Sequence, residues 1–180
     1  MEHFLLYIYR MSLDNLALVA VFAALIFCTL FHKCAGQNWL RPCICGMLAV
    51  WVGVVLWVTI LSRSVDSSYR FSPIPLHTYW SVFTGGDQEL LRSAFMNVVL
   101  FYPAGLLLGS LPPEKWSSRR GMICSVLALM LFSMVIEMTQ YFRQLGNAEF
   151  DDILHNTLGA VAGISAFRTF SKSIKLEKWL

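Results

Sequence analysis

Five long apolar stretches limit how this chain can fold more than any other feature of the sequence. A helix needs roughly 20 predominantly apolar residues to cross the hydrocarbon core of a bilayer, and each stretch is close to that length. In lipid a spanning segment must satisfy its own backbone hydrogen bonds, which an α-helix does. We therefore predict an all-α integral membrane bundle of about five transmembrane helices. The stretches comprise residues 13–31, 44–61, 95–111, 122–138 and 153–170.

The amino-acid composition argues against a soluble protein. Hydrophobic residues make up 57% of the 180 residues and charged residues 14%, whereas soluble domains have about 45–50% and about 25%. A chain of this size cannot hide so many apolar side chains from water, because small domains keep much of their surface exposed. The net charge of +3 is small and no basic run suits a phosphate backbone. We expect the lipid bilayer as a partner and no nucleic acid.

We divide the chain into three parts. Residues 1–40 form an N-terminal segment with an added transmembrane helix, residues 41–170 form the main helical bundle, and residues 171–180 form a basic tail. No cleavage site of small residues follows the first apolar run, so this run is interpreted as a retained helix rather than a signal peptide. Aromatic residues in segments 1–11 and 76–83 suit the membrane interface.

The distribution of Lys and Arg predicts the orientation. Nine of the 14 basic residues fall in the 32–43 loop, the 112–121 loop and the C-terminal tail, which share one side of a five-span bundle. Cytoplasmic loops carry the excess of Lys and Arg. We therefore predict a multi-pass protein of the cell membrane with its N-terminus outside and its C-terminus in the cytoplasm. The connections at 62–94 and 139–152 then lie outside.

The five cysteines do not form a recognisable disulfide or metal pattern. Cys28 and Cys124 fall inside predicted spans, where Cys behaves as a small apolar residue. The pair Cys43 and Cys45 lacks the second Cys or His pair that a zinc site requires. We predict no metal and no cofactor.

Polar side chains gather at the outer ends of the predicted helices. A charge at the centre of a membrane costs about 2.5–3.5 kcal/mol on the insertion scale, so ionisable residues within spans generally serve a function. Glu137 lies one turn from the membrane end and needs a partner or water. Eight polar residues at these helix ends are predicted to form one outward-facing ligand-binding site. They are Arg63, Asn97, Glu137, Gln140, Arg143, Asp151, Asp152 and Asn156.

Helical spacing indicates which of these residues share a face. Glu137 and Gln140 are three residues apart, and Asp152 and Asn156 are four apart. Small residues let helices approach closely, so we expect the third and fifth spans to pack tightly and bring Asn97 near Asn156. Two small-residue ridges are equally compatible with a homo-oligomer. The predicted packing residues are Gly105, Gly109, Gly159 and Gly163.

Each candidate also has a simpler structural interpretation. Arg63 can be a snorkelling anchor, and the acidic pair at 151–152 can cap a helix N-terminus. Asn97 and Asn156 can form hydrogen bonds that hold helices together. His155 has no second His nearby in the sequence, which is more typical of a core residue than of a base or a metal ligand.

Several motifs occur in order between residues 50 and 168. Leu61-Ser-Arg63 stands at a helix end, and Pro73-Ile-Pro75-Leu76 follows it. An N-x3-F-x-P-x-G motif begins at Asn97, E-x2-Q begins at Glu137, and D-D-x3-N-T-x-G begins at Asp151. Together these motifs resemble the VanZ-like family of small bacterial membrane proteins. In one departure, the Arg that the family often has shortly before the Asp pair is missing, and Arg143 is the candidate substitute.

The resemblance implies a protein of the bacterial cytoplasmic membrane that acts on the cell envelope, since the family takes its name from a member linked to resistance to the glycopeptide antibiotic teicoplanin. It does not imply a reaction. Our first hypothesis is a non-catalytic protein whose site binds or shields a lipid-linked cell-wall precursor or a lipoglycopeptide. The alternative is a membrane enzyme that acts on a phosphate-bearing lipid or wall precursor. A small transporter is a third interpretation, although no inverted repeat supports it.

Overall fold

The computed structural model describes residues 2–34, 37–65, 71–72, 75–85, 88–111, 118–145 and 148–173. The predicted basic tail beyond residue 173 and the side chains of residues 1–11 lie outside what the structure describes.

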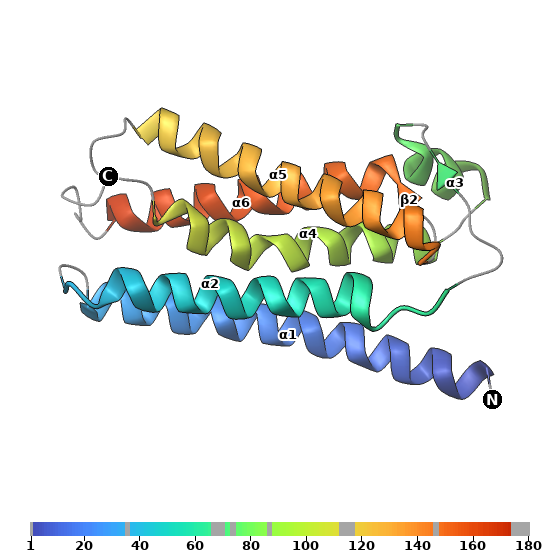
Figure 1. Ribbon diagram of the computed structural model, residues 1–180, viewed down its shortest axis with the longest axis horizontal. Helices are drawn as coiled ribbons and strands as arrows, with labels where there is room; N and C mark the ends of the chain where they lie inside the picture. Colours follow the sequence, from blue (N-terminus) through green and yellow to red (C-terminus); the bar gives the residue numbers. More distant parts are fainter. Residues whose placement is uncertain are drawn as a thin grey trace.

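Within these residues, long helices run side by side along the length of the molecule (Figure 1). Helix α2 continues directly into a π-helical turn, η1 (Trp57–Leu61), and a short helix, α3 (His77–Gly85), covers the end of the bundle at which α1 begins. The long helices are α1 (Glu2–Cys34), α2 (Leu40–Leu56), α4 (Gln88–Gly109), α5 (Ser118–Arg143) and α6 (Phe150–Ser173).

Three helical segments are long and apolar enough to cross a membrane. These are Leu40–Leu61, Gln88–Gly109 and Arg119–Arg143, and α1 holds a shorter apolar segment, Leu18–Phe31. Helix α6 is not one of the three, and it carries charged residues near both of its ends, Asp151 and Asp152 at the start and Arg168 and Lys172 at the finish. The predicted all-α membrane bundle is confirmed, whereas the number of spans stays a prediction.

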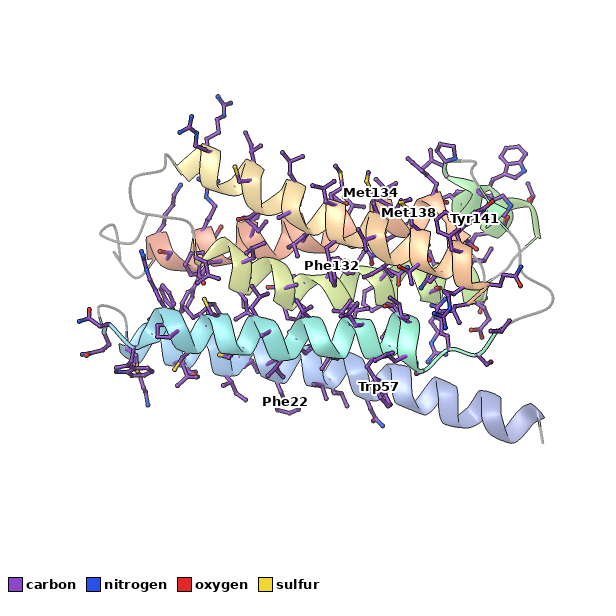
Figure 2. The ribbon with its side chains drawn as sticks, viewed as in Figure 1. Phe22, Trp57, Phe132, Met134, Met138 and Tyr141 are labelled. Carbon is purple, nitrogen blue, oxygen red and sulfur yellow. The ribbon has the colours of Figure 1, made fainter. Side chains whose placement is uncertain are left out.

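The outer surface of the bundle is apolar, as a lipid-facing surface should be. Leu127, Leu131 and Val135 recur every four residues along α5, and each is exposed. Phe22 of α1 and Trp57 of η1 are each 62% exposed and point away from the bundle (Figure 2). These side chains would be costly in water but are compatible with the hydrocarbon of a bilayer.

Helix α4 lies at the centre of the bundle and contacts α1, α2, α5 and α6. Its buried side chains Leu100, Phe101, Leu106 and Leu107 form much of the core. A three-ring aromatic cluster joins α1 to α6, with ring centroids 5.7 Å apart for Phe27–Phe31 and 5.0 Å apart for Phe31–Phe167. Helix α4 is therefore the element against which the others are positioned.

The contact between α4 and α6 depends on glycine. A Cβ at Gly105 would overlap the carbonyl oxygen of Ala160, and a Cβ at Gly159 would overlap that of Val98. Gly163 likewise lies against the carbonyl of Tyr102. Backbone therefore packs directly on backbone, which is the kind of approach that small-xxx-small spacing allows.

Replacing these glycines should destabilise the bundle. We expect Gly105→Ala and Gly159→Ala each to lower the free energy of unfolding by about 1–3 kcal/mol, because the added methyl group must push the helices apart. Thermal unfolding of the purified protein in detergent measures the change. Gly53→Ala is the matched control, since a Cβ at Gly53 meets nothing within 4 Å, and alanine there should be neutral or stabilise α2 by up to ~1 kcal/mol. Equal effects at all three positions would contradict the close α4–α6 contact.

Candidate functional site

Polar residues from α4, α5, α6 and the segments that connect them interact with one another, and α6 begins at the end of the bundle that α3 covers (Figure 1). Two short strands hold the connecting segments there. β1 (Phe71–Ser72) pairs in parallel with β2 (Ala148–Glu149), which directly precedes α6. This pairing joins the segment after η1 to the start of α6. The strands were not predicted, because two residues are too short to show an alternating pattern.

Asp152 and Asn97 connect the first turn of α6 to α4. The Asn97 amide Nδ2 donates to Asp152 Oδ1 at 2.7 Å. The α4–α6 glycine contact begins at Val98, next to Asn97 on α4, and at Gly159, about two turns after Asp152 on α6. Close helix packing therefore places the side chains of Asn97 and Asp152 within hydrogen-bonding distance. The sequence predicted that Asn97 would lie near Asn156, and the structure instead places the bond one helical turn earlier on α6.

Glu137 approaches the same place from α5. Its side chain is only 7% exposed, and its Oε2 accepts a hydrogen bond from the backbone N–H of Glu149 at 3.3 Å. The charges of Asp152, Arg63 and Glu149 all act on it. Three carboxylates from α5, β2 and α6 therefore lie within electrostatic range of one another.

Arg63 supplies positive charge to this group. It follows η1, and its charge acts favourably on both Glu137 and Asp152. Its Nη1 donates to the backbone carbonyl of Leu145 at 3.3 Å, which holds the guanidinium near the end of α5. We call Arg63, Asn97, Glu137, Glu149 and Asp152 the polar cluster. Its formal charge is negative, with three carboxylates and one guanidinium.

Asp151 has a different role from its neighbour. It is 1% exposed, and its two carboxylate oxygens accept hydrogen bonds from the backbone N–H groups of Leu76 at 2.6 Å and Thr78 at 2.8 Å. These N–H groups lie at the start of helix α3, so Asp151 caps α3 although it lies 73 residues after Thr78 in the sequence. Consecutive helical residues point about 100° apart, which is why adjacent Asp side chains serve separate elements.

Two further predicted residues lie one helical turn from the cluster. Gln140 donates from Nε2 to the carbonyl of Thr59 in η1 at 2.9 Å, and Asn156 donates from Nδ2 to the hydroxyl of Ser133 at 2.9 Å. In the described part of the chain, Gln140 Oε1 and Asn156 Oδ1 are buried without a hydrogen-bond partner. Buried acceptors of this kind normally bond to something, so both are suited to accept from a ligand or from water.

Arg143 is not brought into the polar cluster. It is exposed in the last turn of α5, whereas Arg63 is the basic residue whose charge acts on the carboxylates. The sequence offered both arginines as candidates, and the structure distinguishes them.

Sequence reasoning missed Glu149 and the contact of His155. Glu149 lies two residues before the Asp pair. This position in the acidic segment 149–152 is the signal by which the sequence could have identified it as a site residue. His155 is buried, and its Nε2 lies 3.0 Å from the hydroxyl of Tyr79 in α3. Asp151 and His155 together therefore attach α3 to α6.

The arrangement suits recognition of a polar, hydrogen-bonding or cationic group. Carboxylates accept hydrogen bonds and attract amines, and Asn97 and Arg63 fix the orientation of the carboxylates. Among the described residues, no group of three His, Cys, Asp or Glu side chains is placed to hold a metal ion.

Comparisons with known proteins find a family that matches the part of the chain containing this site. The sequence profile of the VanZ/LLP1 family matches residues 44–171. Protein VanZ from Enterococcus faecium is 23% identical over 135 residues, which cover 74% of this chain and 78% of that protein. No solved structure matches the chain. The family match includes the whole polar cluster and leaves α1 outside.

The capping role of Asp151 can be tested apart from the polar cluster. We expect Asp151→Asn to raise the hydrogen-exchange rates of the α3 backbone amides roughly 10–100-fold, because the loss of a charged acceptor weakens the bonds to Leu76 and Thr78 by about 1.5–3 kcal/mol. Hydrogen exchange followed by mass spectrometry measures this. Asp152→Asn is the matched control and should leave α3 protected. Equal exchange in the two variants would show that Asp151 does not hold α3.

Proposed function

The chain belongs to the VanZ/LLP1 family, and on that basis we propose a multi-pass cell-membrane protein with a glycopeptide-resistance-like role. Its polar cluster binds the polar part of an envelope amphiphile, either a lipid-linked wall precursor or a lipoglycopeptide. Binding shields that molecule or changes its availability at the membrane surface.

The observation that carries this proposal is the group of largely buried carboxyl side chains at the end of the bundle that α3 covers. Asn97 and Asp152 form a 2.7 Å hydrogen bond, and Glu137 lies beside them with 7% exposure. Ionisable groups kept at this depth are costly and are generally functional. The excess of carboxylates and the unpartnered oxygens of Gln140 and Asn156 favour a ligand that donates hydrogen bonds, such as one that carries amino and hydroxyl groups.

The same side chains disfavour the alternative enzyme. A phosphate-bearing lipid would meet three carboxyl groups and one guanidinium, whereas phosphate is usually bound by several basic groups or backbone N–H donors. A divalent cation could reverse this balance, but no described group of three acidic, His or Cys side chains is placed to bind one. Binding without catalysis is therefore the function that the site supports best.

The charge distribution along the chain supports the orientation that we propose. The start of α6, which carries Asp152, lies at the same end of the molecule as the start of α1, while α6 ends at the other (Figure 1). With the basic connections in the cytoplasm, the cluster faces the outside of the cytoplasmic membrane. An outward-facing site is where envelope precursors and glycopeptides are accessible.

Loss of the carboxylates should abolish the resistance phenotype. We expect expression of the wild-type chain in a glycopeptide-susceptible bacterium to raise the inhibitory concentration of teicoplanin. Asp152→Asn and Glu137→Gln should remove this increase, because each lost charged hydrogen bond contributes about 1.5–3 kcal/mol, or roughly 10–100-fold in binding. Susceptibility and the amount of protein in the membrane are measured together.

Thr139→Val is the control for these variants. Thr139 lies between Glu137 and Gln140 on α5, but its hydroxyl bonds only to the carbonyl of Val135 in its own helix. This variant should retain the wild-type phenotype. A wild-type chain that leaves susceptibility unchanged, or variants whose phenotype follows membrane abundance alone, would overturn the proposed function.

Cysteine labelling tests the orientation. Gly85 ends α3, the helix that covers the end of the bundle at which α6 begins, and a Cβ there meets nothing within 4 Å. Gly85→Cys should therefore react with a membrane-impermeant maleimide in intact cells. The native Cys43 and Cys45 are exposed near the opposite end and should react only after the membrane is permeabilised. Labelling in the reverse order would overturn the orientation.

A further inference from the structure

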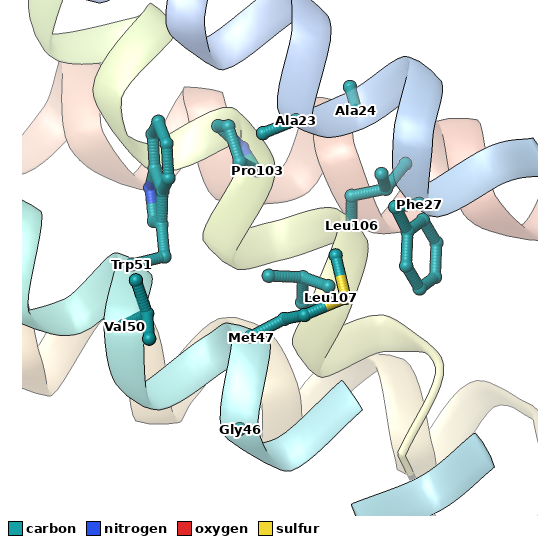
Figure 3. Close-up of a pocket in the computed structure, with 10 residues that line it drawn as sticks. All are labelled: Ala23, Ala24, Phe27, Gly46, Met47, Val50, Trp51, Pro103, Leu106 and Leu107. Atoms are coloured by element: carbon teal, nitrogen blue, oxygen red, sulfur yellow. The ribbon is translucent and has the colours of Figure 1, made fainter. Parts of the chain in front are cut away.

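We propose that an apolar cavity between α1, α2 and α4 binds one acyl chain of a bilayer lipid. The cavity has a volume of about 400 Å³, within the range of roughly 300–1,000 Å³ that is typical of small-molecule sites. Figure 3 shows Ala23, Ala24 and Phe27 of α1 facing Met47 and Trp51 of α2 across the cavity, with α4 forming the floor.

The chemistry of the lining selects hydrocarbon. Each of the ten side chains or glycines that line the cavity is apolar apart from the indole nitrogen of Trp51. That nitrogen donates to the carbonyl of Leu100 at 2.9 Å, so it is already satisfied by α4. The lining therefore offers no partner to a headgroup, an ion or a sugar, and a polar occupant would lose its own hydrogen bonds.

The position of the cavity identifies the source of the hydrocarbon. Two of its walls belong to the segments Leu40–Leu61 and Gln88–Gly109, which are apolar enough to span a membrane. At 1.5 Å per residue, roughly 18 Å of helix separates Trp51 from Arg63 at the polar end, which places the cavity at the depth of the acyl chains. Gly46 and Val50 line the cavity and are exposed, so it opens sideways towards lipid.

Small residues create this space. Ala23 and Ala24 on α1 face Gly46 on α2, and a Cβ built on Gly46 meets nothing within 4 Å. Larger side chains at these positions would fill the cavity. Because α1 lies outside the residues that match the family, 44–171, one wall of the site is contributed by the N-terminal helix that this chain adds. The site shares no residue with the polar cluster and does not depend on the proposed function.

Photolabelling in vesicles tests the proposal. The full chain is reconstituted in phosphatidylcholine vesicles that contain a small fraction of phosphatidylcholine with a diazirine in the acyl chain. After illumination, mass spectrometry locates the labelled residues. We expect labelling concentrated on the cavity residues Met47 and Val50, above the level at the lipid-facing residues Leu127 and Leu131 of α5.

Two cavity-filling variants and a matched control make the result specific. Gly46→Leu and Ala24→Leu should each reduce cavity labelling about fivefold or more, because the added side chain occupies the space. Gly53→Leu lies on the same helix, also in open space, but does not line the cavity, and it should leave labelling unchanged. Ala24→Leu fills the cavity from a different helix, so the test still stands if Gly46→Leu fails to fold.

Two results would overturn the proposal. Labelling that is equal on α5 and in the cavity, and that neither filling variant reduces, would mean that lipid only coats the surface here. Efficient disulfide formation between two chains carrying Val50→Cys, together with absent lipid labelling, would mean that a second copy of the protein covers the opening.

Discussion

The backbone contact between α4 and α6 is the interaction on which the rest of the structure depends. Gly105, Gly159 and Gly163 let the two helices approach until main chain meets main chain. In lipid, helix association gains little from the hydrophobic effect, so close van der Waals packing has to hold the helices together. This contact also fixes how far α6 is rotated and shifted along α4. The positions of Asn97 and Asp152 follow from that register.

Polar residues also join α5 to three neighbouring elements. Gln140 bonds to Thr59 of η1, Glu137 accepts from the backbone of Glu149 in β2, and Ser133 accepts from Asn156 of α6. The π-helical turn η1 belongs to this arrangement, because Gln140 bonds to its Thr59 and Arg63 follows it directly. Such turns are rare and are often found at functional sites. The short helix α3 is attached to α6 by the hydrogen bonds of Asp151 and His155.

Hydropathy and spacing predicted the helices and the glycine ridges well, because these depend on local sequence. The face of a helix also follows from spacing, so the different directions of Asp151 and Asp152 could be anticipated. The register between two helices does not follow from spacing within either one. For this reason the sequence predicted Asn97 near Asn156, one turn away from Asp152, to which it bonds. The contacts of Glu149, Tyr79 and the β1–β2 pair depend on how long connections fold back on the bundle. No local pattern encodes those contacts.

The late position of α6 in the chain has a consequence for biogenesis. Chains are made from the N-terminus, and segments enter the membrane in that order. Asn97 and Glu137 are therefore synthesised before their hydrogen-bond partners, Asp152 and the backbone N–H of Glu149. Until α6 arrives, α4 and α5 have to reside in or near the bilayer with polar groups that lack their final partners. The last helix and the strand before it thus supply the hydrogen-bond partners of Asn97 and Glu137, and a chain truncated before β2 and α6 would be exposed to membrane quality control.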